Sequence, residues 1–290
     1  MNVRKSVVAG RFYPGSAKDL QGMIAMCLSG ASTFFGPNAP VDKDTQDTPC
    51  MLMLPHAGYI FSAPVACAAL LGTRLPKTVI LLCPNHTGYG RSRFGVWPDG
   101  AWETPLGLVP VNADLAQKLA AKKPFAADTL CHMKEHSIEV ELPLLQAMAM
   151  KQGTDFDIVP VCIASQTNAD LKAAGLALAD MAGDAILKGD VGIVVSSDMN
   201  HYEDEKTTMA KDNLALEKVL AEDARGLLET CAQNRITMCG AGPMALALYA
   251  LRSLRLVPAR KTWVVAHETS GRVAGDFDRV VGYAGVRFYL

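Results

Sequence analysis

The chain has 290 residues, 50% of them hydrophobic, and a formal net charge of -1 at pH 7. This length and composition can bury a large core, and the near-neutral charge argues against binding to nucleic acid or to an anionic membrane. No stretch approaches the roughly 18 uninterrupted apolar residues of a membrane span, and the first residues are too poor in apolar side chains for a secretory signal. We therefore expect a soluble, cytoplasmic protein.

Segments of helical periodicity alternate with short apolar runs that end in turn residues. Apolar runs without polar alternation are typical of strands covered on both faces of a parallel sheet. The alternation predicts one α/β domain over residues 1–290, with a central, mostly parallel sheet flanked by helices. In chain order, we expect helices over residues 19–28, 62–71, 114–122, 143–150, 168–187, 203–220, 223–233 and 243–254. We expect strands over residues 51–54, 79–83, 94–97, 158–163, 191–195, 263–267 and 280–289, irregular strands within 102–111, and a polar loop over 36–48.

Three of these helices have identifiable start signals. Ser62 is expected to cap the helix over residues 62–71, with Pro64 in its first turn, where the missing N–H of proline costs nothing. Pro143 is expected in the first turn of its helix for the same reason. The helix over residues 114–122 is expected to be capped by Asn112 or by Asp114.

Histidines follow three of the predicted strands. His56 comes after the run ending in Leu54, His86 follows the strand over residues 79–83, and His201 lies shortly after the strand over residues 191–195. Ligands of open α/β sheets bind outside the carboxyl ends of the strands, and neutral imidazole is a common ligand for zinc, iron and copper. Each histidine alone is as consistent with a surface or hydrogen-bonded role, but the three together predict a site at this edge.

Two further residues are candidates for the same site. Cys239 lies in the sequence CGAGPM just before a predicted helix, whose amino-terminal dipole would favour a thiolate, although a buried structural cysteine at a tight turn is an equal alternative. Asp198, in SSDMNH, could serve as an acidic ligand, as a base or as the partner that orients a histidine. Alternatively, Asp198 or Asn200 caps the helix that follows.

A competing motif, H-x-x-E-H, is formed by His132, Glu135 and His136 and is the pattern of inverzincin metallopeptidases. Peptidase chemistry requires both histidines on one face of a helix. The alternation of apolar residues over 138–142 and the presence of Pro143 instead predict a loop or extended segment. We therefore expect no peptidase.

Several motifs in order along nearly the whole chain resemble those of the Memo-like family, also called AmmeMemoRadiSam system protein B. Together these motifs are more specific for the family than any one of them is alone. They are AGRFYP, PHAGY, CPNHTG, EHSIEVELP, SSDMNHY, CGAGP, TSG and VVGYAG.

The resemblance implies a fold similar to that of class III extradiol dioxygenases, which are non-haem iron enzymes. By motif, it implies that His56, His86 and Cys239 bind a metal, and that Asp198 and His201 lie in the same pocket, with His201 at the place of the dioxygenases' acid–base histidine. It also suggests AMMECR-like and radical SAM proteins as partners.

Two departures from the family pattern leave the substrate contacts open. His267 stands near a position that is often aromatic in relatives, and CGAGP differs from other variants of the cysteine motif. His136 lies in a matching motif without an assigned role.

Two functions of different classes follow. The first is a metal-binding, dioxygenase-like redox enzyme that acts on a small molecule, with iron(II) first and copper or zinc as alternatives. A thiolate ligand favours copper(I) or zinc and is open to oxidation, which weakens an extradiol assignment. The second is a non-catalytic module that recognises a peptide or partner protein, or that handles copper or iron.

Overall fold

The computed structural model describes residues 2–35, 48–254 and 261–290. The predicted polar loop over residues 36–48 falls almost entirely outside them. The other predicted helices and strands are confirmed, apart from two helix starts discussed below.

Four parallel strands form the centre of the main sheet. They lie side by side in the order β2 (Met51–Leu54), β9 (Val191–Ser196), β3 (Thr78–Pro84) and β8 (Asp157–Ile163). Nearly every residue in them is buried, as expected for strands with both faces covered. Because the four strands are parallel, their carboxyl ends lie at one edge of the sheet.

Antiparallel strands extend this centre on both sides. Next to β2 runs β12 (Val280–Tyr289), which also pairs with β11 (Lys261–Thr269) and β10 (His201–Glu203). Next to β8 runs β4 (Phe94–Val96), which pairs with β7 (Ala126–Ala127). The sheet is therefore mixed, and the prediction of a mostly parallel sheet holds for its centre only.

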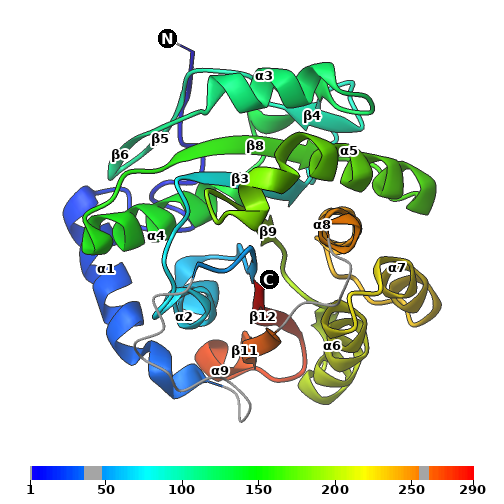
Figure 1. Cartoon of the computed structure of the whole chain (residues 1–290). Helices are drawn as coiled ribbons and strands as arrows, with labels where there is room; N and C mark the ends of the chain where they lie inside the picture. The colour runs from blue at the N-terminus through cyan, green and yellow to red at the C-terminus, as the bar shows by residue number, and fades with distance from the viewer. Residues whose placement is uncertain (1, 36–47, 255–260) are drawn as a thin grey trace.

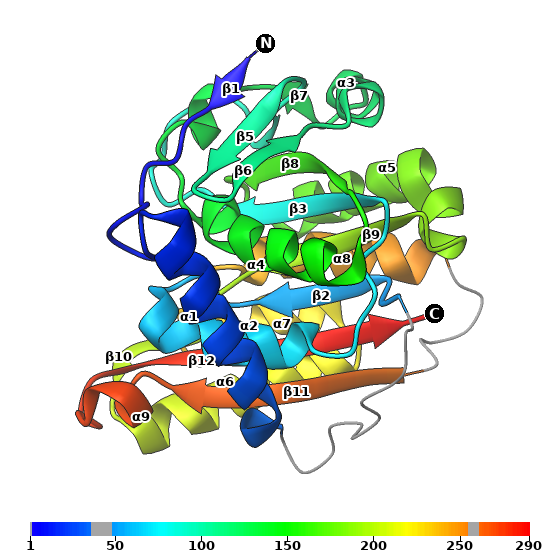
Figure 2. The same ribbon diagram turned by 90° about the vertical axis from the view of Figure 1, so that its left-hand side faces the viewer.

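Helices cover both faces of the sheet, and the buried apolar residues form one continuous core. Figures 1 and 2 show two helical layers that sandwich the strands. The first layer consists of α1 (Ala17–Gly30), α2 (Tyr59–Leu70) and α4 (Ser137–Gln152). The second consists of α5 (Asn168–Leu187), α6 (Glu205–Leu220), α7 (Ala224–Gln233) and α8 (Ala241–Ser253). The chain is thus a single α/β domain, as predicted.

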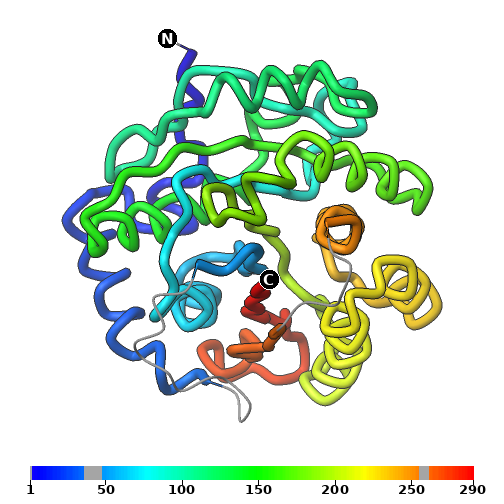
Figure 3. Tube along the Cα trace, in the orientation of Figure 1, coloured from blue at the N-terminus to red at the C-terminus, as the bar shows by residue number. Residues whose placement is uncertain are grey.

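Short elements complete the fold. A small separate sheet contains β1 (Val3–Arg4), β5 (Ala101–Thr104) and β6 (Gly107–Pro110), while α3 (Ala113–Ala121) packs on β4 and β8. The remaining short helices are η1 (Ala31–Phe34), η2 (Leu130–His132) and α9 (Gly271–Ala274). The Cα trace in Figure 3 begins beside the small sheet and ends in the main sheet. In the described part of the chain, no helix has the length and apolar character needed to cross a membrane.

Two predicted helix starts are wrong. The helix predicted from Ser62 begins at Tyr59, and the helix predicted from Pro143 begins at Ser137. Pro64 and Pro143 therefore lie beyond the first turn of their helices. Both helices are buried over most of their length, so neither has a continuous polar face that would mark its start in the sequence.

The cap of α3 settles an alternative that the sequence left open. The side chain of Asn112, not Asp114, accepts a hydrogen bond from the backbone N–H of Leu115 (3.1 Å). Asp114 lies in the first turn, where its charge complements the helix dipole.

Candidate metal centre

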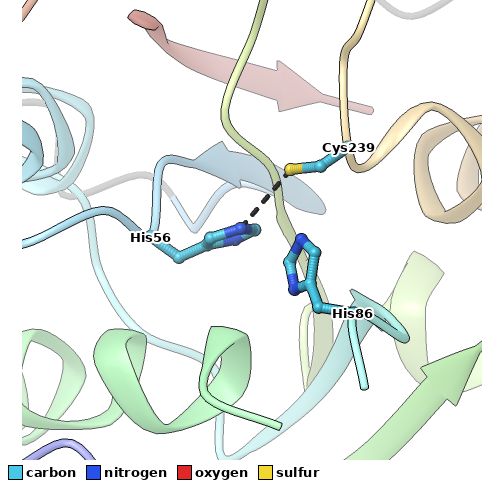
Figure 4. A group of neighbouring side chains, drawn as sticks. All are labelled: His56, His86 and Cys239. Carbon is cyan, nitrogen blue, oxygen red and sulfur yellow. Dashed lines mark hydrogen bonds between the residues drawn. The ribbon is translucent and has the colours of Figure 1, made fainter. Parts of the chain in front are cut away.

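Three residues far apart in the sequence bring donor atoms together at the carboxyl edge of the sheet. His56 follows β2, His86 follows β3, and Cys239 precedes α8, and one donor atom from each lies within 4.8 Å of the other two. Figure 4 shows the two imidazoles and the thiol facing a common space, with His56 Nε2 3.4 Å from Cys239 Sγ. Nitrogen and sulfur ligands on a tetrahedral zinc ion lie about 3.6 Å apart, so this spacing fits a bound metal.

The orientation of the His56 ring is set by a chain of hydrogen bonds. Its Nδ1 lies 2.7 Å from Ser196 Oγ, which in turn lies 2.7 Å from Glu141 Oε1 and 3.0 Å from the Ser137 carbonyl oxygen. The Ser196 hydroxyl donates its one proton to one of these two oxygens, so it accepts from His56 Nδ1–H. The Nε2 lone pair is then free to point toward Cys239. Burial lowers the pKa of His56 well below its usual range, which keeps the imidazole neutral.

A carboxylate orients the His86 ring. Its Nδ1 lies 3.0 Å from Glu135 Oε1, and its backbone N–H donates to Glu135 Oε2 (2.6 Å). Burial opposes ionisation of Glu135, but hydrogen bonds from His86 and Ser137 outweigh it and lower the pKa of the carboxyl. Because Glu135 can only accept, the proton of His86 sits on Nδ1 and the Nε2 lone pair is available to a metal. Pairing of a metal-binding histidine with a carboxylate is typical of protein metal sites.

A second group, His86, Glu135 and His136, also lies within ligand distance. Glu135 Oε1, however, already accepts from the N–H groups of His136 (2.9 Å) and Ser137 (3.1 Å) and from the Ser137 hydroxyl (2.7 Å). Its lone pairs are used, so this group acts as support. The His136 ring stacks on His86 with centroids 5.1 Å apart and meets His56 edge-on at 5.5 Å, which makes it a wall of the site.

Cys239 lies in a turn that approaches the strand end very closely. Its Sγ accepts a hydrogen bond from the Asp198 backbone N–H (3.2 Å), and a Cβ on Gly240 would lie only 2.3 Å from the Cβ of Ser197. Only glycine fits at position 240. Burial raises the pKa of the Cys239 thiol and the nearby Asp198 carboxyl raises it further, so the predicted thiolate stabilisation by the helix dipole is outweighed. A bound cation would be needed to hold the thiolate at neutral pH.

Asp198 supports the His56 backbone in this structure. Its Oδ1 accepts from the His56 backbone N–H (2.8 Å), and it belongs to neither donor group. Burial raises the pKa of Asp198 to about 7. The next helix, α6, is capped by Asp204, so the alternative in which Asp198 or Asn200 forms this cap is wrong.

His201 is held beside the donor group without joining it. Its Nδ1 lies 3.1 Å from the Thr237 carbonyl oxygen, and its backbone N–H donates to Thr237 Oγ1 (2.8 Å). A carbonyl only accepts, so Nδ1 carries the proton and Nε2 is free to accept another. Burial lowers the pKa of His201, which favours this neutral form.

The two remaining histidines lie elsewhere. His132 is fully buried against Trp97 and Trp102, and its Nε2 lies 3.0 Å from the Gly95 carbonyl oxygen. His132 ends η2, and residues 133–136 lie outside the helices before α4, so the H-x-x-E-H residues do not share a helical face, as the sequence predicted. His267 Nε2 pairs with the buried Asp212 at 3.0 Å.

The sequence indicates the three donor residues but not most of their supports. Glu135 stands out only within the peptidase pattern, and Ser196 only as part of the strand end. Glu141 and Ser137 gave no individual signal, although both lie in the motif EHSIEVELP.

The chain is similar to several known proteins. A family model described as Memo-like protein matches residues 4–287. A MEMO1 family protein of Thermotoga neapolitana is 41% identical over 290 residues, covering 97% of this chain and 98% of the relative. One of Methanopyrus kandleri is 38% identical over 292 residues, covering 98% of each chain. An uncharacterized Escherichia coli K12 protein of known structure covers 82% of this chain and 98% of its own, at a TM-score of 0.49 and 13% identity.

The fold and the donor residues define an α/β protein with a candidate metal centre at the carboxyl edge of its sheet. The family match over nearly the whole chain and the relatives above 30% identity identify it further. The chain belongs to the Memo-like family.

Proposed function

We propose that this protein is a metal-dependent redox enzyme that binds iron(II) through His56, His86 and Cys239 and acts on a small molecule. One observation carries the proposal. Both imidazoles have Nδ1 engaged in hydrogen bonds, which leaves both Nε2 atoms for one ion beside the Cys239 sulfur. Such pre-set tautomers are what metal binding requires.

The charge of the donor set is compatible with iron. Two neutral imidazoles and one thiolate leave a divalent ion with a net charge of +1, as two imidazoles and one carboxylate would. A thiolate is a softer ligand than a carboxylate and therefore favours copper(I) or zinc. Copper is thus the second candidate metal and zinc the third. A bound iron(II) would supply electron transfer between the substrate and dioxygen.

His201 and Asp198 have separate tasks in this proposal. His201 holds Nε2 unprotonated and can take a proton from a substrate hydroxyl. Asp198 fixes the His56 backbone through Oδ1 and the Cys239 sulfur through its own N–H, so it positions two of the proposed ligands at once.

Metal analysis tests the site. Protein purified anaerobically is expected to contain about one equivalent of metal per chain, and His56→Ala and Cys239→Ala are each expected to lose most of it. Cys231→Ala, at another buried cysteine outside the donor group, is the matched control and is expected to keep the wild-type content. Unchanged metal content in both ligand variants would refute the site.

A binding module is the second candidate function. It is favoured by Tyr89, Leu130 and Met133, which are about half exposed on segments that follow His86 or precede Glu135 and could contact a peptide or partner protein. AMMECR-like and radical SAM proteins are the partners to test first. Turnover of a small molecule with iron(II) and oxygen that His201→Ala abolishes would support the enzyme. Saturable partner binding that survives loss of the metal residues would support the module.

A further inference from the structure

A cavity of about 420 Å³ adjoins the candidate metal centre. Two of the proposed ligands, His86 and Cys239, form part of its wall. The rest of the wall comes mainly from the loop over residues 88–93, which follows β3, and from residues 163–166 at the end of β8. Its size suits a small molecule that reaches the metal ligands.

Two arginines line this cavity, and their charges are balanced differently. Arg93 forms an ion pair with Asp170. Arg91 is exposed, and within the described ranges its guanidinium has neither an ion-pair nor a hydrogen-bond partner. The cavity wall therefore carries about one uncompensated positive charge.

The loop that carries these arginines is firmly held. Asp128 Oδ2 accepts from the backbone N–H groups of Arg91 (2.6 Å) and Ser92 (2.9 Å), and Asp128 Oδ1 accepts from that of Leu130 (3.1 Å). Both Asp128 oxygens thus face backbone donors of the loop, and Asp128 is not part of the cavity wall.

Close packing at Gly90, the residue before Arg91, also holds the loop in place. Gly90 has a φ of 91°, and a Cβ there would lie 2.8 Å from both Asp128 Oδ2 and the Cys131 Cβ. Only glycine fits there, so the loop can pack closely against Asp128 and Cys131 beside Arg91.

We propose that the substrate of this site is a small organic carboxylate, and that Arg91 binds its carboxylate while the rest of the molecule extends toward His86 and Cys239. The proposal rests on the metal-dependent function proposed above. A planar guanidinium binds a carboxylate through two parallel hydrogen bonds. In the metal-free protein, one uncompensated charge on the cavity wall matches a monoanion, whereas a phosphate dianion would lack a second uncompensated cation.

Benzoate and inorganic phosphate are suitable probes, because they present the two kinds of oxyanion without further chemistry. A carboxylate can also bind a metal directly, so the full-length chain is first treated with a chelator. Binding is followed by NMR titration of wild type, Arg91→Gln and Arg74→Gln. Arg74 is exposed and lies before β3, at the opposite edge of the sheet, so it is the matched control.

Benzoate is expected to bind wild type and Arg74→Gln equally, and Arg91→Gln about tenfold more weakly or not at all. Phosphate is expected to bind wild type more weakly than benzoate does. Equal benzoate affinity in wild type and Arg91→Gln, an equal loss in both variants, or tighter binding of phosphate would overturn the proposal.

Metal content, measured on the same samples before chelation, separates this proposal from the function on which it rests. Arg91→Gln is expected to hold as much metal as wild type. If His56→Ala and Cys239→Ala also retain their metal while benzoate binding still depends on Arg91, the metal centre is refuted and the anion site stands. If those two variants lose metal while Arg91→Gln binds benzoate normally, the metal centre stands and the carboxylate site is refuted.

Discussion

The two histidines of the candidate metal centre are supported by buried carboxyl groups in opposite protonation states. On one side, His86 Nδ1 meets Glu135 directly at 3.0 Å, and hydrogen bonds to Glu135 lower the pKa of that carboxyl. On the other side, His56 reaches Glu141 only through the Ser196 hydroxyl, and burial raises the pKa of Glu141 well above its usual range. An ionised carboxylate makes its histidine a stronger ligand, whereas a neutral one only fixes the ring's orientation.

The difference follows from how many donors each carboxyl meets. Glu135 accepts at Oε2 from the His86 backbone N–H, and at Oε1 from backbone and side-chain donors at the start of α4. Within the described residues, Glu141, in the second turn of α4, accepts only from Ser196, and its Oε2 has no partner. A fully buried carboxyl with so few donors stays protonated.

The largest expected effect comes from removing the charged support. Glu135→Ala leaves the N–H groups of His86, His136 and Ser137 without their acceptor. We expect metal affinity to fall by about 10- to 100-fold and the free energy of unfolding to fall by about 3 kcal/mol. Zinc titration against a competing chelator and urea unfolding measure the two quantities.

Glu103→Ala is the control for this variant. Glu103 is partly exposed and pairs with Lys5 at the surface, so its loss is expected to cost less than about 1 kcal/mol and to leave metal affinity unchanged. If Glu135→Ala bound metal as tightly as wild type, the carboxylate would have no part in the metal centre.

A smaller effect is expected on the His56 side. Ser196→Ala breaks the link between His56 Nδ1 and Glu141 without removing a charge, so metal affinity is expected to fall by about tenfold. The ¹⁵N shifts of His56 should also show a mixture of tautomers, which a purely structural role of Ser196 would not produce. Ser165→Ala, which removes a hydroxyl that contacts Asp170 instead, should change neither quantity.

The sequence predicted the three donor residues better than their supports, for a physical reason. An apolar run ending in proline or asparagine and then histidine marks a strand end locally, and parallel strands bring such ends together. His56 and His86 could therefore be placed without knowing the strand order. Cys239 needed the second signal of the CGAGP motif, because its turn approaches the strand end only through the packing of α8.

The supports depend on how α4 lies against the sheet, which no local pattern reports. Apolar alternation over residues 138–142 predicted an extended segment, yet this stretch is helical and buried on nearly all sides. A helix without a polar face has no readable period, so Glu135 and Glu141 could not be assigned to the two sides of the metal centre. The antiparallel edges of the sheet could not be foreseen either, because strand direction is set by connections and not by composition.

The smallest change in metal affinity, and the sharpest test of the comparison, is expected from Glu141→Gln. The amide keeps an oxygen for Ser196 and has nearly the shape of the protonated acid, so metal affinity should stay close to wild type. Its effect should appear in the pH dependence of stability. In the unfolded chain a glutamate loses its proton above a pKa of about 4.3, whereas Glu141 in the folded chain keeps it to much higher pH.

Between these two pKa values the folded state binds more protons, so this group makes stability fall as pH rises, by up to about 1.4 kcal/mol per pH unit. Glu141→Gln removes that slope, and its stability advantage over wild type should grow from pH 5 to pH 8 in urea unfolding. For Glu217→Gln, at an exposed position, the free energy of unfolding should change with pH as it does in wild type. A Glu141→Gln curve that also runs parallel to wild type would mean that Glu141 is ionised, and the contrast between the two sides of the metal centre would disappear.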